Sequence, residues 1–168
     1  MVHLSPVNPV QHRRRIADWL RSEHVARWWG NPDQRLAQFD ATPAGENAMI
    51  VQDDLPVGYV RWETIDTAAL AEAGLVDIPA GSIDIDIFIG DPNQAGRGAG
   101  SAALALLFEH LERTTEAPLV GLCTSVKNHV AHRAFEKSGC SRIARFDDDV
   151  FGPCWVYGRR LQRIESVS

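Results

Sequence analysis

The sequence predicts one α/β domain with a mixed sheet that spans residues 1–168. Apolar segments with strand-like composition alternate along the chain with amphipathic segments of helical period, which is typical of this fold class. No linker, internal repeat or low-complexity segment separates them. A chain of 168 residues is also long enough to bury one core of its own.

Two helices are expected near the N-terminus. Asn8 and Pro9 form an N-cap and a first helical position, and the helix they begin should run to about Leu20. A second, short helix should begin near Ser22. It should end within residues 28–32, where a glycine and a proline stop it.

Three strands are expected next. Residues 48–52 and 57–65 form a predicted hairpin around a turn at 53–56. After an irregular connection at 67–80, residues 82–89 alternate, with isoleucines on one face and Asp84, Asp86 and Phe88 on the other.

The C-terminal half predicts two helices and three strands. A helix over 101–114 has a leucine-rich buried stripe, and a helix over 128–138 should direct Val130, Ala131, Ala134 and Phe135 inward. Short strands are expected over 119–124, 140–147 and 154–161.

Composition and charge exclude several classes of function. The net charge is −5 and the pI about 5.6, so nucleic acid is not an expected partner, because phosphate binding needs a basic surface. The three cysteines are widely spaced, which indicates buried free thiols in a reducing cytoplasm rather than disulfides or a metal site. No signal-peptide pattern or membrane-spanning run occurs, so no membrane partner is expected.

The most informative segment is the glycine-rich run at residues 94–100, between a predicted strand and a predicted helix. Glycines at positions 96, 98 and 100 leave bare backbone N–H groups at the positive end of the helix, which favours a bound pyrophosphate. The run lacks the third glycine of a dinucleotide-binding fingerprint and the lysine of a P-loop.

Two motifs resemble the GNAT acyltransferase superfamily. Residues 95–100 are similar to its [RQ]-x-x-G-x-[GA] loop, although Ala95 stands where the family carries Arg or Gln and Gln94 lies one residue early. Residues 128–140 are similar to its N-x-x-A-x-x-x-Y-E-K-x-G-F segment. The resemblance implies a mostly antiparallel central sheet flanked by helices, acetyl-CoA as co-substrate and no metal.

Within that superfamily the chain resembles the aminoglycoside 6′-N-acetyltransferases. Residues 22–30, 57–59 and 85–90 are similar to their H-[VI]-x-x-W-W-G, [IV]-G-Y and [IL]-D-x-F-I-G segments. Acyltransferases of siderophore precursors share part of this pattern.

The resemblance implies a set of residues around acetyl-CoA. Backbone N–H groups of the strand should polarise the thioester carbonyl, the glycine loop should hold the pyrophosphate, and the later helix should flank the CoA arm. The predicted cofactor-binding residues are Ile87, Phe88, Ile89, Gln94, Ala95, Gly96, Arg97, Gly98, Ala99, Gly100, Ser101, Asn128 and Phe135. Phe135 replaces a tyrosine that many members have, so it cannot donate a proton to the leaving thiolate. Tyr157 is interpreted as structural.

The acceptor side depends on carboxylates and aromatic rings. Asp86 is predicted to be catalytic, as the proton acceptor, because a strand rich in isoleucine desolvates it and makes it a better base. The predicted substrate-binding residues are Trp28, Trp29, Asp84, Asp86 and Asp148. Arg61 shares a strand face with Tyr59, and it would repel a cationic aminoglycoside if it faced the pocket.

The sequence therefore predicts a cytoplasmic enzyme that transfers an acetyl group from acetyl-CoA to a primary amine of a small molecule. Aminoglycosides, and hence antibiotic resistance, are one candidate role. The alternatives are an acyltransferase for a siderophore-type hydroxylated amine, and a CoA-binding module without turnover. The oligomeric state, monomer or homodimer, stays open.

Overall fold

The computed structural model describes residues 1–163, and its seven strands within that range form one sheet in the order β1-β2-β3-β4-β5-β7-β6. The strands are β1 (Val2–Ser5), β2 (Asn47–Gln52), β3 (Leu55–Thr64), β4 (Ile83–Ile89), β5 (Leu119–Ser125), β6 (Ser141–Asp148) and β7 (Gly152–Arg160). The β1–β2, β2–β3, β5–β7 and β6–β7 pairs are antiparallel, and β4–β5 is parallel. The prediction of an α/β fold with a mixed, mostly antiparallel sheet is confirmed.

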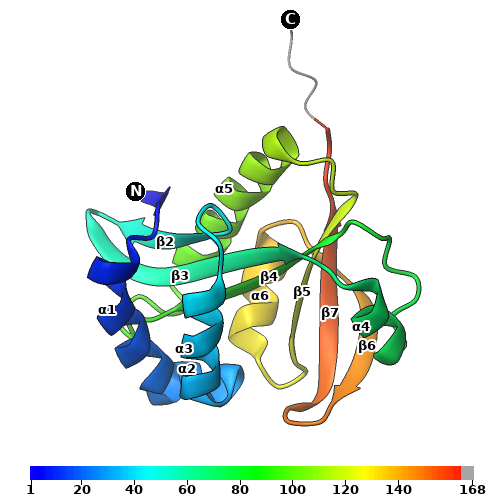
Figure 1. Ribbon diagram of the computed structural model, residues 1–168, viewed down its shortest axis with the longest axis horizontal. Coiled ribbons are helices and arrows are strands. Elements are labelled where there is room, and N and C mark those ends of the chain that lie inside the picture. The colour runs from blue at the N-terminus through cyan, green and yellow to red at the C-terminus, as the bar shows by residue number, and fades with distance from the viewer. Residues whose placement is uncertain (164–168) are drawn as a thin grey trace, which may run out of the picture. The chain divides into compact units, whose positions relative to one another are not determined.

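Helices occupy the connections between the strands other than the β2–β3 and β6–β7 turns (Figure 1). They are α1 (Pro9–Arg21), α2 (Glu23–Trp29), α3 (Pro32–Ala41), α4 (Thr67–Glu72), α5 (Ala99–Thr114) and α6 (His129–Lys137). The predicted helices near residues 8–20, 22–29, 101–114 and 128–138 are all present, within two residues of their expected ends.

The described chain divides into two compact units. Unit 1 comprises Met1–Arg61 and Asp86–Ala103, and unit 2 comprises Trp62–Ile85 and the chain from Leu104 onward. The chain passes from one unit to the other within β3, β4 and α5. One domain over residues 1–168 stays a prediction, and residues 164–168 lie outside the described range.

In unit 1, α1, α2 and α3 pack on one another (Figure 1). Asn8 caps α1 as expected, because its side chain accepts a hydrogen bond from the Gln11 N–H at 3.1 Å. The sequence analysis missed α3. Asn31 and Pro32, interpreted only as a stop, also cap and begin that helix, and the Asn31 side chain accepts from two backbone N–H groups.

The predicted hairpin is formed by β2 and β3, and β1, which the sequence analysis also missed, pairs with β2. The turn is left-handed at Asp53 and Asp54, with φ of 50° and 65°. In β3, a Cβ at Gly58 would lie 2.4 Å from the Phe88 carbonyl oxygen, so only glycine allows this close approach of the backbones.

Unit 2 contains β5, β7 and β6 side by side (Figure 1). The leucine stripe of α5 is buried as expected, with Leu104, Leu107, Phe108 and Leu111 fully inaccessible. The connection predicted to be irregular contains α4, capped by the Asp66 side chain, which accepts from the Ala68 N–H.

Helix α6 corrects two expectations about its faces. Val130 is half exposed rather than inward, whereas His132, interpreted as a surface residue, is 4% exposed and stacks on the Tyr157 ring. The cap at Asn128 and the buried Phe135 fix the helical phase, and positions 128, 132 and 135 then share one face. Burial and the loss of hydration lower the pKa of His132.

All three cysteines were expected to be buried free thiols, and one of them is not buried. Cys140 and Cys154 are buried free thiols, and burial raises the pKa of each. Cys123 is exposed, because it lies at a position of β5 that faces outward.

Candidate active site

The centre of the site is an ion pair in unit 1 between Arg61 of β3 and Asp86 of β4. The Arg61 guanidinium donates to Asp86 Oδ2 at 2.8 Å. The Arg61 side chain is 6% exposed, whereas that of Asp86 is 29% exposed. The carboxylate is therefore held on one side by a buried cation and is partly exposed.

A polar relay supports this pair from α3. Arg61 Nε donates to the Thr42 hydroxyl at 3.3 Å, and that hydroxyl donates to the Gln38 carbonyl at 2.8 Å. Because Thr42 is the C-cap of α3, the guanidinium is tied to the end of a helix. The sequence did not indicate this role for Thr42, since α3 itself was missed.

Tyr59 lies beside the same pair, as strand alternation predicted for residues 59 and 61. Its hydroxyl accepts a hydrogen bond from the Asn47 amide at 3.2 Å. Burial raises the pKa of Tyr59, an effect that its hydrogen bonds with Asn47 and Thr42 partly offset. The phenol therefore stays neutral and acts as a dipole beside the carboxylate.

Aromatic rings pack together next to Tyr59. Phe88, two residues after Asp86, contacts Trp19, Trp29 and Tyr59 with ring centroids 6.1, 4.8 and 5.8 Å apart. Trp29 packs against this core, and Trp28 lies under the Arg27 guanidinium. Both predicted tryptophans are partly buried, and only Trp29 contacts the rings around the site.

The end of β4 is anchored by α1 and α2. His24 Nε2 lies 3.1 Å from the Ile89 carbonyl oxygen, and the Trp19 ring covers Gly90 so closely that a Cβ there would lie 2.1 Å from it. His24 belongs to the segment similar to H-[VI]-x-x-W-W-G, but the sequence analysis gave it no role. These contacts hold Ile87, Phe88 and Ile89 in place immediately before the glycine loop.

The glycine loop follows β4 in the same unit. Gly96 and Gly98 have φ of 73° and 94°, a conformation that favours glycine. Helix α5 begins at Ala99 rather than Ser101, so Ala99, Gly100 and Ser101 form its first turn. The first N–H groups of a helix lack intrahelical partners and can bind an anion.

Within the loop the backbone N–H groups are not equivalent. Those of Gln94 and Ala95 donate to the Asp91 carbonyl, and that of Arg97 donates to the Gln94 carbonyl. Gly98 instead accepts from the Ser101 hydroxyl and the Ala102 N–H. The donors suited to a phosphate are therefore those of the first turn of α5, together with the exposed Arg97 side chain.

The other predicted residues belong to unit 2. Asn128 caps α6 and also donates to the Thr124 hydroxyl, and Phe135 is 5% exposed against Tyr157. Asp84 pairs with Gly121 of β5. Asp148 Oδ1 accepts from the backbone N–H groups of residues 150 and 151, which gives this carboxylate a role in the β6–β7 turn.

Tyr157 is fully buried and bonded on both sides. Its hydroxyl accepts from Arg142 Nε at 2.8 Å and donates to Glu136 Oε1 at 3.0 Å. With both capacities used, the phenol is a structural link, in line with its interpretation from the sequence.

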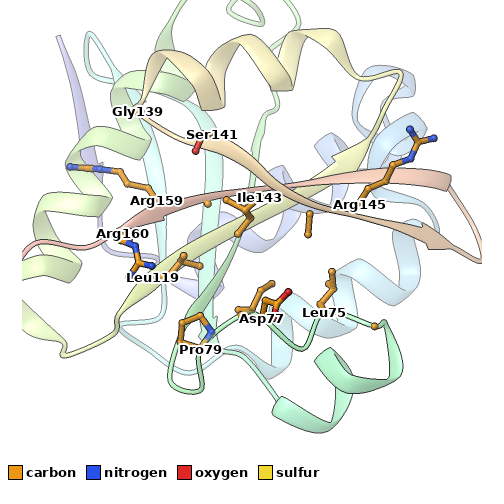
Figure 2. Close-up of a pocket in the computed structure, with 14 residues that line it drawn as sticks. Leu75, Asp77, Pro79, Leu119, Gly139, Ser141, Ile143, Arg145, Arg159 and Arg160 are labelled. Carbon is orange, nitrogen blue, oxygen red and sulfur yellow. The ribbon is translucent and has the colours of Figure 1, made fainter.

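A cavity of about 490 Å³ in unit 2 has no part in this site. Its lining includes the apolar residues Leu75, Pro79, Leu119 and Ile143 and the charged residues Asp77, Arg159 and Arg160. The Arg145 guanidinium points away from it (Figure 2). None of the predicted site residues lines it.

Two further properties of residues 1–163 concern membrane-spanning helices and metal ligands. Over that range, no helix combines the length and apolar character needed to cross a membrane. In the same residues, no three His, Cys, Asp or Glu side chains are grouped so that they could hold a metal ion.

Comparisons with known proteins identify the family of this chain. A family model described as an acetyltransferase (GNAT) domain matches residues 8–148. Aminoglycoside N(6′)-acetyltransferase type 1 of Klebsiella pneumoniae is 24% identical over 148 residues, which cover 76% of this chain and 68% of the relative.

Solved structures share the fold. Aminoglycoside acetyltransferase AAC(6′)-Ib in complex with coenzyme A matches with a TM-score of 0.76 and 21% identity, over 95% of each chain. RimL, a ribosomal L7/L12 alpha-N-protein acetyltransferase in complex with coenzyme A, matches with a TM-score of 0.72 and 11% identity, over 95% of this chain and 94% of that one.

Proposed function

This chain belongs to the GNAT acetyltransferase family, and from that premise we propose that its Asp86 site receives the primary amine of a small molecule for acetylation by acetyl-CoA. The observation that supports this proposal is the position of Asp86. Its partly exposed carboxylate lies on β4, the strand that leads into the glycine loop within unit 1.

The reaction needs a bound co-substrate, a free amine and a path for one proton. The amine nitrogen attacks the thioester carbonyl carbon, a C–N bond forms, and the C–S bond breaks to release the CoA thiolate. In our proposal the Asp86 carboxylate takes the proton that the ammonium group loses. The first turn of α5 and Arg97 hold the pyrophosphate, and N–H groups of Ile87, Phe88 or Ile89 polarise the carbonyl.

In this scheme, solvent protonates the CoA thiolate. Phe135 has no ionisable group, and the Tyr157 hydroxyl is bonded to Arg142 and Glu136. A thiolate is a good leaving group because the ordinary pKa of a cysteine-type thiol is only about 8.5, and near neutral pH it takes a proton from solvent after release.

Aminoglycosides are the first acceptors to test, because the Klebsiella pneumoniae relative is an aminoglycoside N(6′)-acetyltransferase. Acetylation of such a drug would make this chain a resistance enzyme. The second candidate is a siderophore-type hydroxylated amine, which the Arg61–Asp86 pair favours because a hydroxylamine carries no positive charge at neutral pH. A cytoplasmic location is also proposed, since the buried thiols of Cys140 and Cys154 are free and suit a reducing compartment.

The direct test is release of free CoA thiol from acetyl-CoA in the presence of an amine panel. The panel contains kanamycin, an alkyl monoamine, a diamine and a hydroxylated amine. We expect turnover with at least one of them, and acetylated product by mass spectrometry. Binding of acetyl-CoA in calorimetry without turnover of any amine would contradict the proposal and favour the module that binds CoA only.

A further inference from the structure

We propose that the cavity in unit 2 is a second ligand site, which binds a small monocarboxylate with an apolar body and holds its carboxylate on Arg160. This inference goes beyond the proposed acetylation, because none of the residues assigned to that reaction lines the cavity. It names a binding site and the chemistry of its ligand in a part of the chain that has no role in acetyl transfer.

One wall of the cavity is a face of the sheet where β5, β7 and β6 lie side by side. Leu119 of β5 pairs with Arg160 of β7, and Gly158 of β7 pairs with Ser141 of β6. Paired residues of antiparallel strands share a face, as do alternate residues of one strand, so these four positions lie on the same side of the sheet. The Ile143 side chain fits closely over Gly158, since a Cβ there would lie 2.5 Å from the Ile143 Cδ1. This wall therefore combines apolar side chains with bare backbone.

Another wall is the connection that follows α4, which contributes Leu75, Ile78 and Pro79. Both ends of this segment are bonded. The Leu75 N–H donates to the Leu70 carbonyl at 2.8 Å, and the Ser82 hydroxyl donates to the Pro79 carbonyl at 2.7 Å. The cavity of about 490 Å³ is thus formed in advance, at a size typical of small-molecule sites, which reduces the ordering cost of binding.

Arg160 is the cation that a ligand in the cavity can reach. Three arginines line it, but the Arg159 guanidinium is 3.4 Å from Glu112 of α5, and that of Arg145 points away (Figure 2). Arg160 is exposed beside Leu119, and within residues 1–163 its guanidinium has no hydrogen bond or ion pair. A guanidinium can bind a carboxylate through two parallel N–H donors. An anionic group next to an apolar body is therefore the ligand that this corner of the cavity fits.

Asp77 limits the charge of that ligand. It is the one acidic residue among those that line the cavity, and Figure 2 shows it nearer Leu75 than Arg160. Three arginines against one aspartate favour an anion over a cation. A second negative charge on the ligand would be repelled by the Asp77 carboxylate. A monocarboxylate is accordingly favoured over a phosphate dianion and over an amine, and the apolar lining favours an apolar body.

The experiment measures dissociation constants by calorimetry on the full chain, without acetyl-CoA, for phenylacetate, phenylacetamide, phenethylamine and phenyl phosphate. The wild type should bind phenylacetate most tightly, by roughly 10-fold over the uncharged phenylacetamide, because a charged hydrogen bond replaces a neutral contact. Arg160→Gln should remove this preference. Arg145→Gln is the matched control and should retain it, because that arginine lines the same cavity but its guanidinium points away.

A second variant tests whether the compounds bind in the cavity. Ala144 of β6 lines it, so the ring of Ala144→Phe would occupy space that the ligand needs. Phenylacetate and phenylacetamide should both bind more weakly to this variant. Val130→Phe is its control, because Val130 is exposed on α6 and does not line the cavity.

Several results would overturn the inference. They are absence of phenylacetate binding at millimolar concentration, equal affinities for phenylacetate and phenylacetamide, and tighter binding of phenyl phosphate or phenethylamine. An unchanged preference in Arg160→Gln would also overturn it, and if that variant does not fold, the four affinities of the wild type decide. None of these measurements uses thiol release, so a failure of the proposed acetylation and a failure of this inference are separate results.

Discussion

Units 1 and 2 each place a buried tyrosine beside an arginine and a carboxylate, and the two groups differ in which of these side chains are exposed to solvent. In unit 2 the Tyr157 hydroxyl lies between Arg142 and Glu136 and uses its donor and its acceptor. In unit 1 the Arg61 guanidinium bonds the Asp86 carboxylate directly, and that carboxylate keeps 29% of its surface.

This difference separates a structural link from a site for chemistry. A polar group whose hydrogen bonds are all satisfied inside the protein rigidifies the fold but has nothing left for a ligand. A carboxylate that is oriented from one side and open on the other is ready to take a proton or bind an ammonium group. We therefore expect substitutions in the two groups to change different properties of the protein.

The largest effect is expected for Asp86→Asn. The amide cannot accept a proton from the ammonium group, so kcat/KM for the amine should fall by roughly 100-fold or more. The affinity for acetyl-CoA, measured by calorimetry, should stay close to that of the wild type. Asp40→Asn, in the exposed pair with Arg13, is the control, and an equal fall in both variants would remove the distinction between the two groups.

A smaller effect is expected for Gly96→Ala. Gly96 has φ of 73° in the loop before α5, so a side chain there strains the backbone. A strain of about 1–2 kcal/mol corresponds to roughly 10-fold weaker binding of CoA if the ligand needs this loop conformation. Titration calorimetry with CoA measures the change.

Gly45→Ala is the matched control for the loop. Gly45 has φ of 89° and, like Gly96, has no atom within 4 Å of an added Cβ. Both variants should lose similar stability in thermal unfolding, but only Gly96→Ala should lose affinity. Equal affinities of the two variants for CoA would exclude the loop as the pyrophosphate site.

Tyr157→Phe should affect stability rather than chemistry. Removal of the hydroxyl leaves Arg142 and Glu136 without their shared partner, but both residues are exposed and water can replace it, so the free energy of unfolding should fall by about 0.5–1.5 kcal/mol. Urea unfolding measures this, and kcat/KM should change little. A large fall in kcat together with an altered alkaline limb of the pH profile would instead identify Tyr157 as the acid for the thiolate, and the contrast between the units would be lost.

The smallest effect is a pH dependence of stability at His132. Burial lowers the pKa of this imidazole in the folded state, so the unfolded chain takes up a proton first as the pH falls through about 6.5. The free energy of unfolding should therefore decrease from pH 7.5 to pH 5.5. Urea unfolding at the two pH values measures this decrease. The part that comes from His132 should be absent in His132→Gln. It should remain in His129→Gln, because His129 is exposed.

Much of the fold was predictable because its signals are local. The cap formed by Asn8 and Pro9, the hairpin turn at Asp53 and Asp54, and the leucine stripe of α5 were each read from a few neighbouring residues, and the structure contains all of them. The elements that were missed had weaker local signals. The first strand is short, and α3 begins at the residues that end α2.

The candidate site was predictable only in part for the same reason. The alternation of β3 placed Tyr59 and Arg61 on one face, but it could not show that Arg61 would meet a carboxylate 25 residues away. His24 lies within a motif, but its partner is the backbone carbonyl of Ile89. Every residue has such a carbonyl, so the residue types alone could not identify this partner. The helical phase of α6 also depended on what it packs against, which is why Val130 and His132 were assigned to the wrong faces.

The sequence alone determined the family, the order of most elements and the residue types available for acyl transfer, because glycine spacing, caps and periodicity are properties of consecutive residues. Tertiary structure alone decided that the arginine of β3 forms an ion pair with the aspartate of β4, that Thr42 accepts a hydrogen bond from this arginine, and that the Tyr157 hydroxyl is bonded on both sides. Charge compensation and burial depend on distances between segments that are remote along the chain, and those distances exist only after the strands have paired and the helices have packed.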